Sequence, residues 1–114
     1  MKIISEKISK KELKELADKI FGNLIKAVVD VEKEIMAVDA ELHSDEEKEL
    51  LEKGSEQKNL WGINLYPDLD GDDFVEFDSM INLRPSQNNR SRGVENSEIR
   101  EKIIQIVNKL VFKE

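Results

Sequence analysis

One stretch, from Leu24 to Leu42, decides whether this chain folds with a sheet or with helices alone; it reads LIKAVVDVEKEIMAVDAEL. Read at helical spacing, its apolar stripe would be Leu24, Val28, Val31, Ile35, Val38 and Leu42. Read as strands, apolar residues alternate from Ile25 and again from Met36, and the β-branched content is high. We favour two strands that turn at Glu32 and Lys33, although the turn lacks an Asn-Gly or Asp-Gly pair. A single long helix is the alternative.

Three other segments carry helix signals, and we expect helices near residues 9–21, 45–53 and 97–112. In the first, Ser9 is placed to cap the helix, and Glu12 follows three residues later to complete a capping box. Ser44 and Glu47 repeat this spacing in the second. The last has the most regular apolar face of the three.

The remaining regular structure is predicted as strands. The expected segments are an edge strand KII at 2–4, then LWGINLYP at 60–67 and FVEFDSMINL at 74–83, joined by DLDGDD at 68–73. We therefore predict a single α+β domain over residues 1–114. It would hold an antiparallel sheet of about four strands, with three helices packed mainly on one face. Apolar residues expected on the open face, which a homodimer would bury, are Leu24, Val28, Phe74 and Met80.

The composition excludes several classes of function. A formal net charge of −7 argues against binding nucleic acid through phosphates and against adhesion to anionic membranes. The chain has no cysteine, so disulfides, thiolate zinc sites and cysteine nucleophiles are excluded. We see neither a signal peptide nor an apolar run long enough for a transmembrane helix, and we expect a cytoplasmic protein.

Three of the four arginines lie in one polar loop, INLRPSQNNRSRGVEN, at residues 81–96. An arginine fork grips carboxylate or phosphate with two parallel hydrogen bonds, so this loop is the candidate anion site. The predicted ligand-binding residues are Arg84, Ser86, Asn88, Arg90 and Arg92. The competing interpretation is an internal ion-pair network, because a segment with six acids and no base precedes the loop. Its acids are Asp68, Asp70, Asp72, Asp73, Glu76 and Asp78.

Evidence for catalysis or for a metal is weaker. The DLDGDD segment does not match the EF-hand calcium-loop pattern in either of its two possible registers. His43 is the only histidine, and no serine stands in a G-x-S-x-G motif, so neither a histidine metal motif nor a serine nucleophile elbow is present in the sequence. The alternative to a binding module is a small metal-dependent hydrolase whose carboxylates converge from two strands. Its acids would be Asp39, Glu41, Glu76 and Asp78, and His43 is a further candidate for that site. We expect binding of an anionic ligand or an acidic partner rather than catalysis, with no catalytic residue, metal or cofactor.

Three segments, IMAVDAELH, NLWGINLYP and INLRPSQNNRSRGVEN, together resemble a small prokaryotic family, domain of unknown function 5674. The resemblance covers nearly the whole chain in the same order. It implies a bacterial or archaeal cytoplasmic protein and favours the two-strand interpretation of residues 24–42. It implies no activity, cofactor or site residue.

Overall fold

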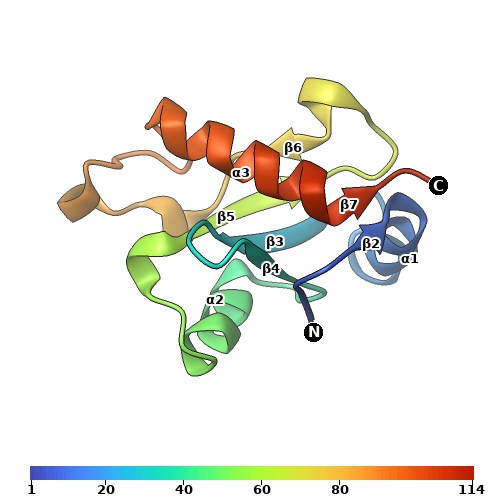
Figure 1. Ribbon diagram of the computed structural model, residues 1–114, viewed down its shortest axis with the longest axis horizontal. Helices are drawn as coiled ribbons and strands as arrows, with labels where there is room; N and C mark the ends of the chain where they lie inside the picture. The colour runs from blue at the N-terminus through green and yellow to red at the C-terminus, as the bar shows by residue number, and fades with distance from the viewer.

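The computed structural model describes residues 1–114, and its centre is a five-stranded antiparallel sheet (Figure 1). In spatial order the strands are β1 (Lys2–Ile4), β4 (Ile35–Val38), β3 (Ile25–Asp30), β5 (Leu60–Leu65) and β6 (Val75–Glu76). The helices are α1 (Lys10–Ile20), α2 (His43–Glu52) and α3 (Ser97–Leu110). Two short strands, β2 (Ile8–Ser9) and β7 (Val111–Phe112), pair in parallel apart from the main sheet. The α+β prediction is confirmed. No helix in the chain combines the length and apolar character needed to cross a membrane.

The two-strand interpretation of the opening stretch is correct. Strands β3 and β4 pair as a hairpin in which Val28 lies opposite Ala37. Asp30 stabilises the turn, because its Oδ1 accepts hydrogen bonds at 2.9 Å from the backbone N–H groups of both Glu32 and Lys33. Glu34 completes the turn with a φ of 58°, in the left-handed region. An aspartate side chain here takes the part that an Asn-Gly pair plays in other hairpins.

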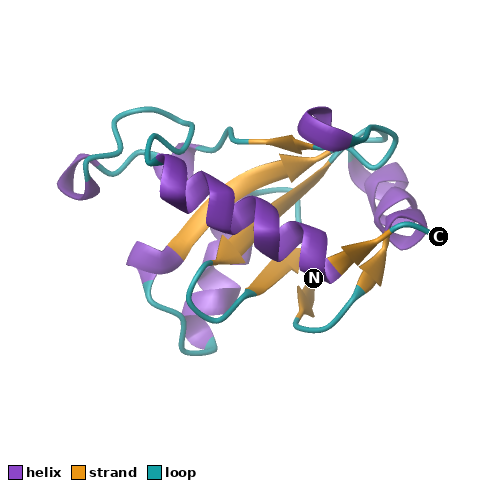
Figure 2. Cartoon of the chain, turned by 45° about the horizontal axis from the view of Figure 1, so that its top comes forward, coloured by secondary structure: helices purple, strands orange, loops and turns teal.

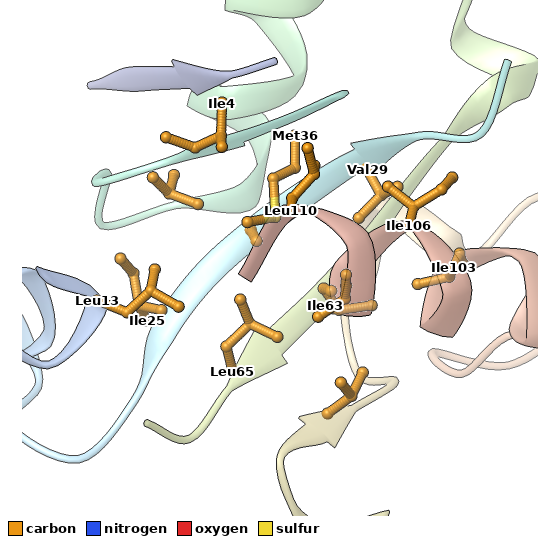
Figure 3. Close-up of a cluster of buried hydrophobic side chains, with 14 of the residues drawn as sticks. Ile4, Leu13, Ile25, Val29, Met36, Ile63, Leu65, Ile103, Ile106 and Leu110 are labelled. Atoms are coloured by element: carbon orange, nitrogen blue, oxygen red, sulfur yellow. The ribbon is translucent and has the colours of Figure 1, made fainter. Parts of the chain in front are cut away.

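Helices cover both faces of the sheet (Figure 2). Helices α1 and α3 pack on one face, where the larger core includes Leu13, Ile25, Ile63 and Ile106 (Figure 3). Helix α2 covers part of the other face through Leu50, which packs against Val28, Ala37 and Leu60.

Two of the residues expected on an open sheet face are therefore buried within the chain. Val28 is fully buried beneath α2, and Phe74 is buried in the larger core. Only Met80 of that predicted set is a highly exposed apolar side chain, at 62%. A homodimer face built on all four residues is not present in this fold.

The predicted strand over 74–83 is wrong beyond Glu76. The chain leaves the sheet after β6 and forms a 3₁₀ turn at Met80–Asn82. The Asn82 side chain then replaces the missing strand: its Oδ1 accepts from the Gly62 N–H at 2.8 Å, and its Nδ2 donates to the Gly62 carbonyl at 2.9 Å. A Cβ on Gly62 would lie 2.5 Å from Cβ of Ser79, so this close crossing requires glycine.

The helix boundaries follow the predictions closely, with one exception in the capping. Ser9 caps α1 by accepting from the Glu12 N–H at 3.0 Å, as expected. Ser44 does not cap α2, because that helix begins earlier, at His43, and has no side-chain cap. Helix α3 ends at Leu110 rather than 112, since Val111–Phe112 form β7.

Candidate functional site

The arginine loop does not act as one unit, and Arg84 is used inside the fold. Its guanidinium donates to the carbonyl of Gln57 and, at 2.6 Å, to the carbonyl of Leu60. It also stacks 4.1 Å from the centre of the Trp61 ring. Burial lowers the pKa of Arg84, although a guanidinium remains charged at neutral pH. Arg84 therefore fixes the loop to β5 and has little left to offer a ligand.

Buried amides hold the rest of the loop in place. Asn89 is 2% exposed, and its Nδ2 donates to the carbonyls of Asn82 at 2.7 Å and Gly93 at 2.8 Å. Its Oδ1 accepts from the Glu95 N–H at 2.8 Å. These bonds satisfy backbone groups that no sheet or helix reaches, so the loop is ordered by its own amides.

The other predicted ligand-binding residues do not line one common pocket. Ser86 and Asn88 are exposed on and just after a 3₁₀ turn, and Asn88 has a φ of 61°. Arg90 is exposed, and its backbone N–H donates to Glu95 Oε2 at 2.5 Å while its side chain makes no hydrogen bond in the chain. Arg92 Nε donates to Asp78 Oδ1 at 2.7 Å. This is the one arginine that pairs with the acidic segment, so the predicted internal network is a single ion pair.

Arg92 instead belongs to a pocket of about 190 Å³ formed by β3, β5, the start of α2 and the segment after β6. We call it the Lys26–Arg92 pocket. Its ionisable and hydrogen-bonding lining residues include Lys26, His43, Ser44, Asn64, Asp78 and Arg92.

Strand register explains why these groups meet. Lys26 on β3 lies directly opposite Asn64 on β5, and alternation places both on the face of the sheet that α2 covers. His43, the first residue of α2, reaches the same place and bonds to the backbone of β5. Lys26, Asn64 and His43 therefore come from strands and a helix, whereas Asp78 and Arg92 come from the irregular segments after β6.

The His43 ring is neutral and has a defined tautomer. Its Nε2 lies 2.8 Å from the Ile63 carbonyl and must carry the hydrogen, which leaves Nδ1 as an acceptor. Burial lowers the pKa of His43, and the charges of Lys26 and Arg92 lower it further. The Ile63 carbonyl and the Asp78 carboxylate oppose that shift.

Several polar groups of the pocket have no partner in the chain. Lys26 forms no ion pair, and its ammonium lies 5.2 Å from the centre of the Phe21 ring. The Asn64 side chain is 7% exposed and its amide oxygen accepts nothing. The two terminal nitrogens of Arg92 are also unbonded, since only Nε meets Asp78. A site with free donors from two cations is suited to an anion.

Two other hollows of the surface use many of their polar groups within the chain. Beside α1, a hollow of about 350 Å³ is lined by four lysines. Lys10 pairs with Asp70 at 2.8 Å and Lys14 with Asp68 at 2.9 Å. Lys113 lies 3.8 Å from Asp70, whereas Lys11 is exposed and forms no ion pair. A larger hollow of about 620 Å³ along α3 is shallow, and its arginine, Arg100, donates to backbone carbonyls. The Lys26–Arg92 pocket is smaller than either, and it brings an unpaired lysine together with the unbonded terminal nitrogens of Arg92.

The carboxylates of the hydrolase alternative do not converge. Strands β3 and β5 lie between β4 and β6, so three strand spacings, roughly 14 Å, separate Asp39 from Glu76. Asp39 pairs with the amino terminus at 3.5 Å, whereas Glu76 accepts from Asn64 at 2.8 Å and Tyr66 at 2.9 Å. Nowhere in the chain do three His, Cys, Asp or Glu side chains stand where they could hold a metal ion.

Sequence reasoning missed Lys26 and Asn64 as site residues. The available signal is that each interrupts the apolar run of its strand, IKAVVD or LWGINL. That signal alone does not show that the two positions are adjacent, because adjacency depends on the β3–β5 register.

Comparison with protein families finds one match, over residues 2–110, to a family described as "Protein of unknown function (DUF5674)". The match covers nearly the whole chain, so the chain belongs to this family. Comparisons with curated proteins and with solved structures find no match.

Proposed function

We propose that this member of the DUF5674 family is a binding module that holds a small anionic molecule in the Lys26–Arg92 pocket. The observation that carries the proposal is that two cations line one pocket, and that the Lys26 ammonium and the terminal nitrogens of Arg92 form no hydrogen bond within the chain. At about 190 Å³ the pocket is smaller than the sites that hold drug-sized molecules, so the ligand is small.

The binding mode follows from the chemistry of the two cations. Arg92 would offer its two terminal nitrogens as a fork to a carboxylate or phosphate, with Nε still on Asp78. Lys26 would add a mobile ammonium from strand β3. His43, neutral at pH 7, would supply an acceptor rather than a charge.

The test is an NMR titration of the ¹⁵N-labelled protein with acetate, inorganic phosphate and sulfate. We expect shifts concentrated at the amides that surround the pocket. Arg92→Gln and Lys26→Met should each weaken binding roughly ten- to a hundredfold, because a hydrogen bond to a charged group contributes about 1.5–3 kcal/mol. Arg90→Gln is the matched control, an exposed arginine of the same loop that lies outside the pocket.

Two results would overturn the proposal. One is the absence of any shift around the pocket at millimolar anion. The other is a loss of binding in Arg90→Gln as large as in Arg92→Gln, which would return the site to the exposed loop predicted from sequence.

We also propose that the protein works in the cytoplasm of a prokaryote, the setting that the family resemblance implies. Fractionation of a native host, followed by immunoblotting, tests this.

A further inference from the structure

The Lys26–Arg92 pocket also has an apolar side. Two of its lining residues, Leu42 and Met80, are 53% and 62% exposed, more than any other large apolar side chain of the chain. They come from different segments, one just before α2 and the other in the 3₁₀ turn after β6. Exposed apolar side chains that gather at the rim of a polar pocket mark a binding surface for a molecule with an apolar part.

The pocket also holds acceptors, which an anion alone leaves unused. The Asp78 side chain is 43% exposed. Its Oδ1 accepts a hydrogen bond from Arg92, while its Oδ2 makes no hydrogen bond in the chain. His43 Nδ1 is a second free acceptor, and the buried amide oxygen of Asn64 is a third. A ligand that matched the whole pocket would carry a hydrogen-bond donor, preferably cationic, beside its anionic group.

An anionic group, a cationic donor and an apolar branch within about 190 Å³ describe one class of small molecule. We infer that the pocket binds a free α-amino acid with an apolar side chain. Its carboxylate would meet Lys26 and Arg92, its ammonium Asp78, and its side chain Leu42 and Met80. This inference rests on the proposed function, since it specifies the ligand of the same pocket.

Calorimetric titration with L-leucine and three analogues tests the inference. The analogue 4-methylpentanoate lacks the ammonium, and leucinamide lacks the carboxylate. The dipeptide glycyl-leucine carries a leucine carboxylate as a chain end but no α-ammonium on that residue, so it distinguishes a peptide terminus from the free amino acid. We expect L-leucine to bind at least tenfold more tightly than each analogue.

Variants of the lining residues test which group of the amino acid each residue contacts. Asp78→Asn should weaken L-leucine at least tenfold and leave 4-methylpentanoate unchanged or tighter, since the analogue has no ammonium to lose a partner. Met80→Gln should weaken leucine more than glycine. Asp72→Asn, an exposed aspartate outside the pocket, is the matched control and should change neither.

The outcomes separate the two proposals. If 4-methylpentanoate binds as tightly as leucine, the amino-acid inference is wrong and the anion site stands. Tighter binding of glycyl-leucine would make the ligand a peptide terminus, which also overturns the inference. If neither leucine nor any carboxylate shifts the amides of the pocket, the proposed function fails as well.

Discussion

The most unusual ionisable group in the chain is Glu46, and replacing it should stabilise the protein. Glu46 lies on α2, is 0% exposed, and neither of its carboxyl oxygens has a hydrogen-bond partner. Burial raises its pKa from the ordinary 4.5 to about 10, and the neighbouring charges of Asp39 and Asp45 add to the rise. Lys26 and the nearby backbone amide of Ala40 oppose it, although that amide is not within hydrogen-bonding geometry.

The sign of the pH dependence follows from that shift. In the folded state Glu46 keeps a proton that the unfolded state releases above pH 4.5. The free energy of unfolding therefore falls, because of this group, as pH rises from about 4.5 towards 10. With about 1.4 kcal/mol for each pH unit, the cost at pH 7 is about 3 kcal/mol and at pH 9 about 6 kcal/mol. Domains of this size have only about 5–15 kcal/mol of stability in total, so the effect is large.

Glu46→Gln keeps the shape of the protonated side chain and removes its titration. We expect the variant to match the wild type near pH 4.5, to exceed it by about 3 kcal/mol at pH 7, and to exceed it by more at pH 9. Urea denaturation followed by tryptophan fluorescence between pH 4.5 and 9 measures the difference, with the exposed Glu52→Gln on the same helix as control. Parallel pH curves for Glu46→Gln and the wild type would refute the argument, since they would mean that the folded carboxyl ionises normally.

Three further variants test the fold around the site. Arg84→Lys should cost about 1.5–3 kcal/mol in urea denaturation, because lysine cannot reproduce the two carbonyl bonds or the stacking, while the exposed Arg90→Lys should stay within about 0.5 kcal/mol. Gly62→Ala should cost about 1–3 kcal/mol, because the new methyl collides with Ser79; equal urea midpoints for variant and wild type would contradict the crossing. Because the folded pKa of His43 lies below 6.5, its contribution to stability is complete above that pH and is lost as pH falls through the folded pKa. The decline should be absent in His43→Gln, and a decline of equal size in that variant would show that another group causes it.

Local signals in the sequence predicted most of the fold. Alternating β-branched residues identified the β3–β4 hairpin, and Ser9 with Glu12 located the start of α1. These features depend on neighbours within a few residues. Residues 77–83 were mispredicted because their alternation is real in sequence, but Asn82 supplies the hydrogen bonds of a strand through its side chain.

The candidate site was only partly predictable, because it depends on contacts between distant segments. Arg92 was among the predicted ligand-binding residues, whereas Lys26 and Asn64 were not. Their meeting requires the register of β3 with β5 and the return of the chain after β6. The tautomer of His43 depends on a carbonyl twenty residues further along the chain.

The arginines show why counting charges along the chain could not identify which guanidinium the fold leaves unbonded. The acidic segment before the loop suggested carboxylate partners for all three arginines, yet Arg84 is satisfied by two backbone carbonyls and an aromatic ring. Asp68 and Asp70 are taken by lysines of α1. Carbonyl acceptors exist at every residue, so sequence cannot show which of them a guanidinium will meet. The arginine suited to a ligand is therefore the one whose terminal nitrogens the fold leaves unbonded beside a second cation, and in this chain that is Arg92.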